Sequence, residues 1–365
     1  MAEQMQFAED RRRLILEEVR LNGSVSIVDL AQRLEVSAVT VRRDLTSMAH
    51  EGLLTRVHGG AVVRRTVQRP AQATLAPMPD QHCVGIVTPS TDYFWPTVVS
   101  GAQAAVRGYR GQLILRSSSY SLEDDRVQMQ RMLDTGRVEG LLVSPVPNMG
   151  RSNEVLSWLH ELGLPVVLME RKVPPTVFAP HLESVTSDQF CSTQLAMHHL
   201  VSLGHRRVGL LTSVGTPHRV AAREAWMSGA RMFGLETRGV ICEDTPGFST
   251  VNRDPLLDSI IERLMSTGTT GVIIHSDKEA IALLQRCGDI GVRVPGDLSL
   301  ISHDDEIASL PEPALTAIRP PKYHIGFEAA SAVFRRLSDP TIPRRRITLA
   351  SDLVIRGTTG APLPR

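Results

Sequence analysis

Short apolar runs that alternate with helix-forming stretches constrain the fold of most of this chain. Seven such runs lie between residues 83 and 303: CVGIVT, QLILRS, EGLLVS, PVVLME, RRVGLLTS, TGVIIHS and LSLISH. A nearly continuous apolar strand is typical of a parallel sheet whose two faces are both covered by helices. The chain beyond residue 80 is therefore predicted to be an α/β protein with doubly wound parallel sheets.

A proline-containing break near residues 172–182, KVPPTVFAPHL, divides these runs into two sets. Two lobes with a cleft between them are expected from this division. We place lobe 1 at about 81–178 and 319–342, and lobe 2 at about 179–318 and 343–365. Ligands of open α/β sheets bind where the carboxyl ends of the strands meet, so the cleft is the predicted ligand site.

Residues 1–62 follow a different, helix-rich pattern. A first helix is expected over residues 10–21, and a later one starts after Ser37. In that later helix Val41, Leu45 and Met48 recur at the spacing of one buried face. This arrangement predicts a helix–turn–helix whose second helix enters the major groove of DNA. The segment LLTRVHGGAVV adds a predicted hairpin wing, and residues 63–80, with three prolines, are predicted to be a linker.

A local basic excess accompanies the predicted recognition helix. Residues 36–69 contain six arginines and two acidic residues, whereas the whole chain has a formal net charge of only +1. Arginines can reach phosphates or a guanine edge, and small side chains let the backbone approach the bases. The predicted DNA-contacting residues are Ser37, Thr40, Arg42, Arg43, Arg56 and His58.

Several classes of protein are disfavoured by the composition. The four cysteines are far apart and form no CxxC pair, so neither a zinc site nor a disulfide framework is expected. No apolar run approaches the ~20 residues of a membrane span, and the polar N-terminus does not resemble a signal peptide. A cytoplasmic location follows as an expectation. The sequence contains no GxSxG, P-loop or post-strand GxGxxG motif, so we expect neither an enzyme nor a cofactor or metal.

Two family resemblances agree with this division of the chain. The segments VSIVDLAQRLEVSAVTVRRDL and EGLLTRVHGGAV resemble the winged helix–turn–helix of DeoR-type repressors. From about residue 82, LGHRRVGLL, VPGDLSLISHDD and LVIRGTT resemble the sensor domain of LacI/GalR-type regulators, which is similar to periplasmic sugar-binding proteins. The resemblance implies a winged helix–turn–helix joined to a two-lobed periplasmic-binding-protein-like type I sensor.

Candidate ligand contacts come from two sources. Three residues are candidates because they lie at or after the end of a predicted strand: Asp92, Ser144 and Asp304. The resemblance adds Phe94, Trp95, Arg171, Arg223 and Asp277. Arg223 and Asp277 are expected to be the central pair, because the resemblance implies that this aspartate accepts from two ligand hydroxyls. Trp226 departs from the family, which has glycine there, and is expected either to narrow the pocket or to fill a gap in the core.

The function that the sequence predicts is a ligand-responsive regulator of transcription. We expect a homodimeric repressor of carbohydrate-utilisation genes that binds a double-stranded DNA operator. Its effector is expected to be a sugar or a related polyol or nucleoside in the cleft. The alternative is a solute-binding protein of a sugar transporter, which would explain residues 82–360 but not the helix–turn–helix.

Overall fold

The computed structural model divides the chain into two compact units, residues 1–77 and 78–365. It describes residues 11–12, 14–15, 24–34, 36–50, 54–57, 60–63, 81–119, 121–146, 152–174, 176–214, 216–247 and 253–363. Among these residues, no helix is both long and apolar enough to cross a membrane.

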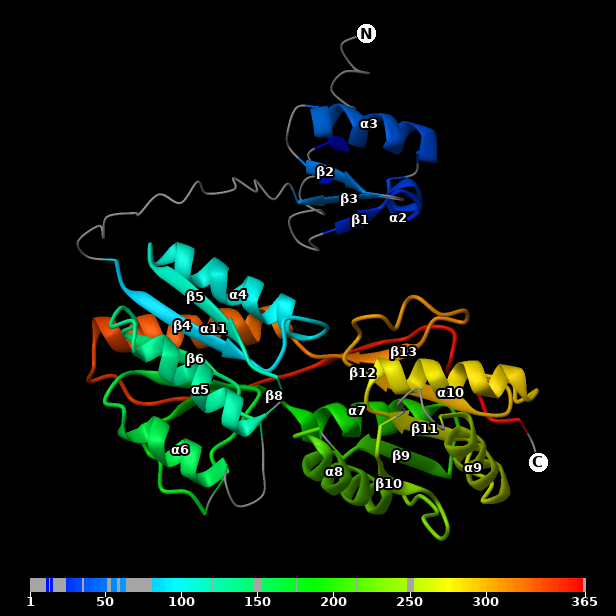
Figure 1. Cartoon of the computed structure of the whole chain (residues 1–365). Coiled ribbons are helices and arrows are strands. Elements are labelled where there is room, and N and C mark those ends of the chain that lie inside the picture. The colour runs from blue at the N-terminus through cyan, green and yellow to red at the C-terminus, as the bar shows by residue number, and fades with distance from the viewer. Residues whose placement is uncertain are drawn as a thin grey trace. The chain divides into compact units, whose positions relative to one another are not determined.

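The N-terminal unit is a helix–turn–helix with a small sheet (Figure 1). Its elements are β1 (Ser24–Ser26), α2 (Ile27–Arg33), α3 (Ala38–His50), β2 (Leu54–Val57) and β3 (Gly60–Val63). The strands pair antiparallel in the order β1-β3-β2, so β2 and β3 form the predicted hairpin. Of the predicted first helix, residues 11–12 and 14–15 are helical and the others lie outside the described residues.

The orientation of α3 follows from which of its side chains are buried and which are exposed. Val41, Leu45 and Met48 are fully buried, which confirms the predicted apolar face. Asp44 also points inward, where it accepts a hydrogen bond from Nε of Arg11 at 2.6 Å. Arg42 and Arg43 are exposed. The three consecutive charged residues of the RRD segment are therefore divided between the core and the surface.

Lobe 1 of the second unit is a parallel sheet between two pairs of helices (Figure 1). Its strand order is β14-β8-β7-β6-β4-β5. The strands are β4 (Cys83–Thr88), β5 (Gln112–Ser117), β6 (Gly140–Val143), β7 (Val166–Met169), β8 (Glu183–Ser187) and β14 (Arg346–Leu349). Helices α4 (Trp95–Gly108) and α11 (Lys322–Ser338) share one apolar cluster with the sheet, and α5 (Leu122–Leu133) and α6 (Ser152–Glu161) share another.

Lobe 2 repeats this architecture with one antiparallel edge strand. Its sheet has the order β10-β9-β11-β12-β13-β15, and only the β13–β15 pair is antiparallel. The strands are β9 (Val208–Ser213), β10 (Cys242–Thr245), β11 (Gly271–Ile274), β12 (Ser299–His303), β13 (Thr316–Arg319) and β15 (Asp352–Val354). The helices α7 (Gln189–Ser202) and α8 (Arg219–Met232) share one apolar cluster with it, and α9 (Arg253–Ser266) and α10 (Asp277–Asp289) share another.

The predicted lobe boundaries need correction at two strands. Both β8 and β14 fall in segments assigned to lobe 2, but they pair with each other and β8 pairs with β7, so both belong to the lobe 1 sheet. The chain therefore passes between the lobes at residue 188, at residues 320–321 and at residues 350–351. The first and third crossings are tied together, because the N–H of Asp188 donates to the carbonyl of Leu349 at 2.8 Å.

Candidate functional site

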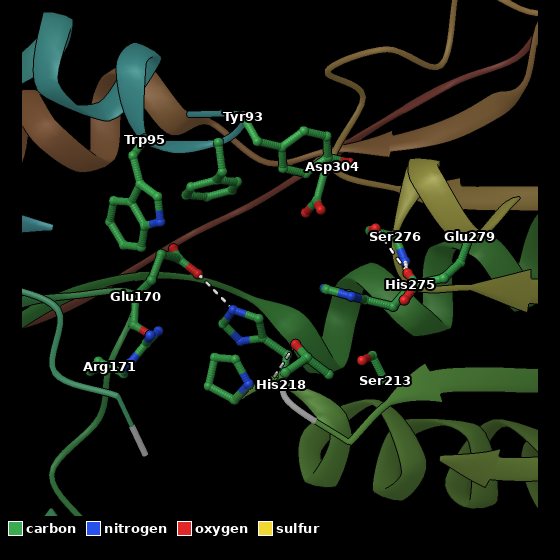
Figure 2. Close-up of a pocket in the computed structure, with 13 residues that line it drawn as sticks. Tyr93, Trp95, Glu170, Arg171, Ser213, His218, His275, Ser276, Glu279 and Asp304 are labelled. Carbon is green, nitrogen blue, oxygen red and sulfur yellow. Dashed lines mark hydrogen bonds and ion pairs between the residues drawn. The ribbon is translucent and has the colours of Figure 1, made fainter. Parts of the chain in front are cut away.

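A pocket of about 220 Å³ lies between the two lobes of the second unit (Figure 2). Lobe 1 contributes the segments that follow β4 and β7, and lobe 2 contributes those that follow β9, β11 and β12. These are the carboxyl ends of parallel strands, where the sequence predicted a ligand site. The lining residues are Tyr93, Phe94, Trp95, Glu170, Arg171, Ser213, Thr216, Pro217, His218, His275, Ser276, Glu279 and Asp304.

One wall of the pocket is aromatic. Phe94 and Trp95 meet edge to face, with ring centroids 5.5 Å apart, and Trp95 is buried at the start of α4. The hydroxyl of Tyr93 accepts a hydrogen bond from the backbone N–H of Asp277 at 3.3 Å, which links a lobe 1 loop to lobe 2. Burial raises the pKa of Tyr93, so this hydroxyl keeps its proton. The wall therefore combines flat apolar faces with a contact between the lobes.

Two adjacent charged residues, Glu170 and Arg171, are buried directly after β7. The Glu170 carboxylate accepts hydrogen bonds from the N–H of Ser187 at 2.6 Å and from its hydroxyl at 2.8 Å. Burial nevertheless raises the pKa of Glu170. Arg171 donates from Nε to the carbonyl of Pro145 at 2.6 Å and from Nη1 to the carbonyl of Glu170 at 2.8 Å. These bonds fix the guanidinium at the edge of the pocket.

Two histidines line the lobe 2 side. Nε2 of His218 lies 3.5 Å from a carboxylate oxygen of Glu170, and its ring centroid is 6.0 Å from that of His275. Burial lowers the pKa of His218 well below its ordinary value and that of His275 to about 4. Both imidazoles are therefore neutral at neutral pH.

Asp304 places a carboxylate in the pocket directly after β12 (Figure 2). Its Oδ1 accepts from Nδ1 of His303 at 3.0 Å. Burial acts to raise the pKa of Asp304, but the neighbouring His275, the hydrogen bond with His303 and the charge of Lys322 outweigh it and lower the pKa to about 2. The carboxylate is therefore ionised at neutral pH.

Backbone strain is concentrated around this pocket. Asp304 has a φ of 106°, Tyr93 a φ of 57° and Glu170 a φ of 54°, all in the left-handed region that non-glycine residues rarely occupy. Each of these residues lines the pocket. Strained residues persist where surrounding contacts hold them, and they gather at binding sites.

Asp277 does not line the pocket, although the sequence predicted it as a central ligand contact. Its carboxylate is fully buried and accepts from the hydroxyl of Ser302 at 2.7 Å. It also accepts from the backbone N–H groups of Glu306 at 2.7 Å and Ile307 at 3.0 Å. In this structure the carboxylate holds the loop that follows Asp304 instead of facing the cavity.

Arg223, the other half of the predicted central pair, is also placed elsewhere. Its Nη2 lies 3.1 Å from Oδ1 of Asp244, whose other oxygen lies 3.2 Å from Nη1 of Arg219. The side chain is 43% exposed and does not line the pocket. Arg223 and Asp277 thus have separate partners in this structure, and their contact with one ligand stays a prediction.

The other predicted ligand contacts divide into two groups. Phe94, Trp95, Arg171 and Asp304 line the pocket. Asp92 is exposed and does not line it, and Ser144 is buried outside it, with an Oγ that has no hydrogen-bond partner among the described residues. Trp226 fills a gap in the core and does not narrow the pocket. Its indole packs in an apolar cluster, where the N–H donates to the carbonyl of Val208 at 2.8 Å.

Several pocket residues were not among the predicted contacts, notably Tyr93, Glu170, Ser213, His218, His275, Ser276 and Glu279. Ser213, His275 and Ser276 end or directly follow β9 or β11, so a stricter use of strand ends would have found them. His218 lies in the loop before α8, and no local pattern in the sequence indicates that its ring turns toward Glu170.

The predicted DNA-contacting residues can be placed in part. Ser37 is exposed before α3, where its hydroxyl accepts from the N–H of Thr40 at 3.2 Å and so begins the helix. Arg42 and Arg43 are exposed on α3. Arg56 belongs to β2, but its side chain lies outside the described residues, and so does His58.

The neutral histidines predict a loss of stability in acid. The pKa of His275 is about 4 in the folded chain against an ordinary value of 6.5, so the unfolded chain gains a proton first as the pH falls. Stability must then decrease from about pH 6.5 down to about pH 4. We expect the melting temperature to fall over this window, and to fall less in His275→Gln. His198→Gln, at an exposed position on α7, is the control and should match the wild type.

Comparison with known families agrees with the two units. Residues 11–67 match the DeoR-like helix-turn-helix domain, and residues 197–359 match the periplasmic binding protein-like domain. The arabinose metabolism transcriptional repressor of Geobacillus stearothermophilus is 27% identical over 346 residues, which cover 91% of this chain and 90% of that protein. The ribose operon repressor of Escherichia coli K12 is 27% identical over 292 residues, 76% of this chain and 82% of that repressor.

Solved structures of transcriptional regulators share the fold. A LacI family regulator from Enterococcus faecium with bound ribose has a TM-score of 0.61 and 22% identity, and the match covers 76% of this chain and 99% of that one. A complex of the regulator CelR with cellobiose has a TM-score of 0.64 and 20% identity, over 88% of this chain and 91% of that one. These relatives are transcriptional regulators and not enzymes. The chain is a helix–turn–helix transcriptional regulator that joins a DeoR-like DNA-binding domain to a periplasmic-binding-protein-like sensor.

Proposed function

We propose that this regulator is a repressor of carbohydrate-utilisation genes whose operator binding is controlled by a monosaccharide in the interlobe pocket. The observation that carries the proposal is the pairing of an aromatic wall, Phe94 and Trp95, with the ionised carboxylate of Asp304 in one cavity. A sugar presents an apolar C–H face and a rim of hydroxyl donors, and this lining offers a partner for each.

The size of the cavity favours a small effector. Its volume of about 220 Å³ is below the roughly 300–1,000 Å³ of pockets that hold drug-sized ligands. Arg171 adds fixed donors for a ring or hydroxyl oxygen, and Glu170 adds acceptors for hydroxyl protons. The names of the relatives point the same way, since they include repressors of arabinose metabolism and of the ribose operon.

Contact with DNA is assigned to α3. Arg42 and Arg43 are exposed on this helix and Ser37 is exposed just before it, whereas Val41 and Leu45 are buried. We infer that a homodimer places two such helices in successive major grooves, about 34–36 Å apart along the DNA. A sugar can alter operator binding only if it binds the two conformations of the dimer with different affinity.

The proposal is tested with the full chain and a defined operator. A pool of random DNA duplexes is first selected on the protein to obtain the operator sequence. Fluorescence anisotropy then measures operator affinity with pentoses, hexoses and disaccharides, and thermal shift measures whether each sugar stabilises the protein. At least one monosaccharide is expected to raise the melting temperature and change operator affinity. If no sugar does either, the proposed effector class is wrong.

Replacing Arg43 by alanine is expected to weaken operator binding by about 2 kcal/mol, near thirtyfold, because a groove contact from a guanidinium is lost. The melting temperature and sugar binding should not change, since Arg43 is exposed on α3. Arg231→Ala removes an exposed arginine from α8 in the sensor and is the matched control. Equal losses in the two variants would contradict the assignment of α3 to the groove.

A further inference from the structure

We propose that His275, His303 and Asp304 form a binding site for a transition-metal dication such as Zn²⁺ or Ni²⁺ at the lobe 2 side of the pocket. The regulatory meaning of such a site rests on the proposed function, whereas metal binding itself does not. No metal was expected from the sequence, where His275 is far from the adjacent pair His303 and Asp304. Strand pairing brings them together: His275 directly follows Ile274 and His303 follows Ser302, and those two residues are partners in the parallel β11–β12 ladder.

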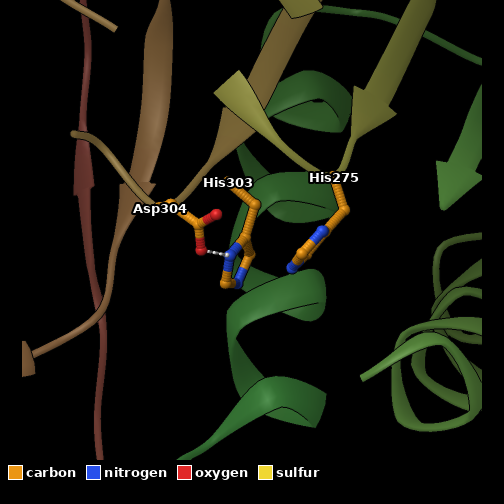
Figure 3. A group of neighbouring side chains, drawn as sticks. All are labelled: His275, His303 and Asp304. Carbon is orange, nitrogen blue, oxygen red and sulfur yellow. Dashed lines mark hydrogen bonds and ion pairs between the residues drawn. The ribbon is translucent and has the colours of Figure 1, made fainter. Parts of the chain in front are cut away.

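The three side chains converge (Figure 3). One potential ligand atom from each lies within 4.8 Å of those of the other two. The two imidazole rings stack with centroids 4.9 Å apart and an interplanar angle of 26°. Figure 3 shows the ring of His303 between Asp304 and His275. This is a donor set of two imidazoles and one carboxylate, which zinc and nickel bind well.

Two buried nitrogen atoms in this group lack partners. Nε2 of His275 and Nε2 of His303 have no hydrogen-bond partner among the described residues, and His303 is only 5% exposed. A buried polar atom without a partner costs free energy and is uncommon in folded proteins. The cluster is therefore not satisfied by the described protein atoms alone, and it borders a ligand pocket.

One pair of ligand atoms is already close together. Nδ1 of His303 lies 3.0 Å from Oδ1 of Asp304, near the separation of about 3.4 Å between two ligands of a tetrahedral zinc ion. An ion bound there would replace the proton that these two atoms share, and a ring nitrogen of His275 would complete the set.

Charge favours a cation over a neutral hydroxyl group at this position. The pocket is lined by the carboxyl groups of Glu170, Glu279 and Asp304 against one guanidinium, that of Arg171. A dication held by the imidazoles and Asp304 would add positive charge to this lining.

Binding requires a modest closure of the site. Tetrahedral zinc with bonds of about 2.0–2.1 Å places its ligand atoms about 3.4 Å apart. The ligand atoms of the three residues now lie at most 4.8 Å apart, so the largest of these distances would have to decrease by roughly 1.4 Å. Rotation of the side chains about their χ bonds can supply this change. The fourth position would face the pocket, where a water or an effector hydroxyl could bind the ion.

The test uses the full chain, reduced and freed of metal by chelation. Isothermal titration with NiCl₂ measures affinity and stoichiometry, and the visible absorption of added Co²⁺ reports nitrogen ligation. We expect one site per chain in the wild type and at least a tenfold loss of affinity in both His275→Gln and His303→Gln. The control is His181→Gln, which removes one ring of another stacked histidine pair, His160 and His181, with centroids 4.4 Å apart. It should retain wild-type affinity.

The outcomes separate the two proposals. If His181→Gln loses the metal and the pocket variants keep it, or if the wild type binds none, the metal site is refuted. His275→Gln is the decisive variant should the buried His303→Gln fail to fold, and circular dichroism checks each protein. Sugar binding is measured in parallel. If the protein binds a sugar but no metal, the metal site is refuted and the proposed function is retained. If it binds a metal but no sugar, the proposed effector class is refuted and the metal site is retained.

Discussion

Asp277→Ala is expected to lower the free energy of unfolding of the sensor by about 3 kcal/mol or more, because the Ser302 hydroxyl and several backbone N–H groups each lose a buried acceptor. The carboxylate that the substitution removes is fully buried and holds residues 305–307. Urea unfolding followed by circular dichroism measures the change. Sugar binding should weaken as well, since this loop positions Asp304.

Arg223→Ala is the matched comparison for Asp277→Ala, because the sequence predicted that both residues bind the ligand. Arg223 is 43% exposed and pairs with Asp244 at the surface. Exposed ion pairs contribute about 0–1 kcal/mol, so little stability should be lost. Sugar affinity should also be close to that of the wild type. A large loss of sugar affinity in Arg223→Ala with full stability would show that the sequence prediction was right and that the pocket lining changes when ligand binds.

Asp304→Asn is expected to weaken effector binding by about 3 kcal/mol, roughly 100-fold, while the protein remains folded. The amide keeps the size of the side chain but loses the negative charge that would accept hydroxyl protons, and it also disturbs the hydrogen bond from His303. Isothermal titration with the sugar identified by thermal shift provides the measurement.

Asp92→Asn is the control for this substitution. Asp92 was predicted to contact the ligand together with Asp304, but it is exposed and does not line the pocket. Its replacement should leave sugar affinity within a factor of two or three. If Asp92→Asn and Asp304→Asn weaken binding equally, the pocket described above is not the effector site.

The fold could be predicted well because periodic patterns are local. The burial of Val41, Leu45 and Met48 follows from their spacing, and the strand runs CVGIVT and QLILRS coincide with β4 and β5. The short strands β8 and β14 were assigned to the wrong lobe. Their sequences, ESVTS and RITL, carry little apolar signal, and their partners are set by contacts between distant segments.

The site could be predicted only in part because two aspartates in similar sequence positions have different surroundings. Asp277 and Asp304 both lie just after strands of the same sheet, β11 and β12. The left-handed backbone of Asp304 and Asp305 turns the next N–H groups toward Asp277, which becomes their acceptor. Asp304 is left facing the cavity. Such a choice depends on loop conformation, which hydrophobic periodicity does not encode.

The three crossings between the lobes also determine when this protein can fold during its synthesis. The lobe 1 sheet needs β14 at residues 346–349 as its edge strand, and the lobe 2 sheet needs β15 at residues 352–354. Neither lobe is therefore a continuous piece of chain, and neither sheet is complete until the ribosome has made nearly all of the sensor. The DNA-binding unit, whose described elements end at residue 63, has no such requirement and can fold while the sensor is still being translated.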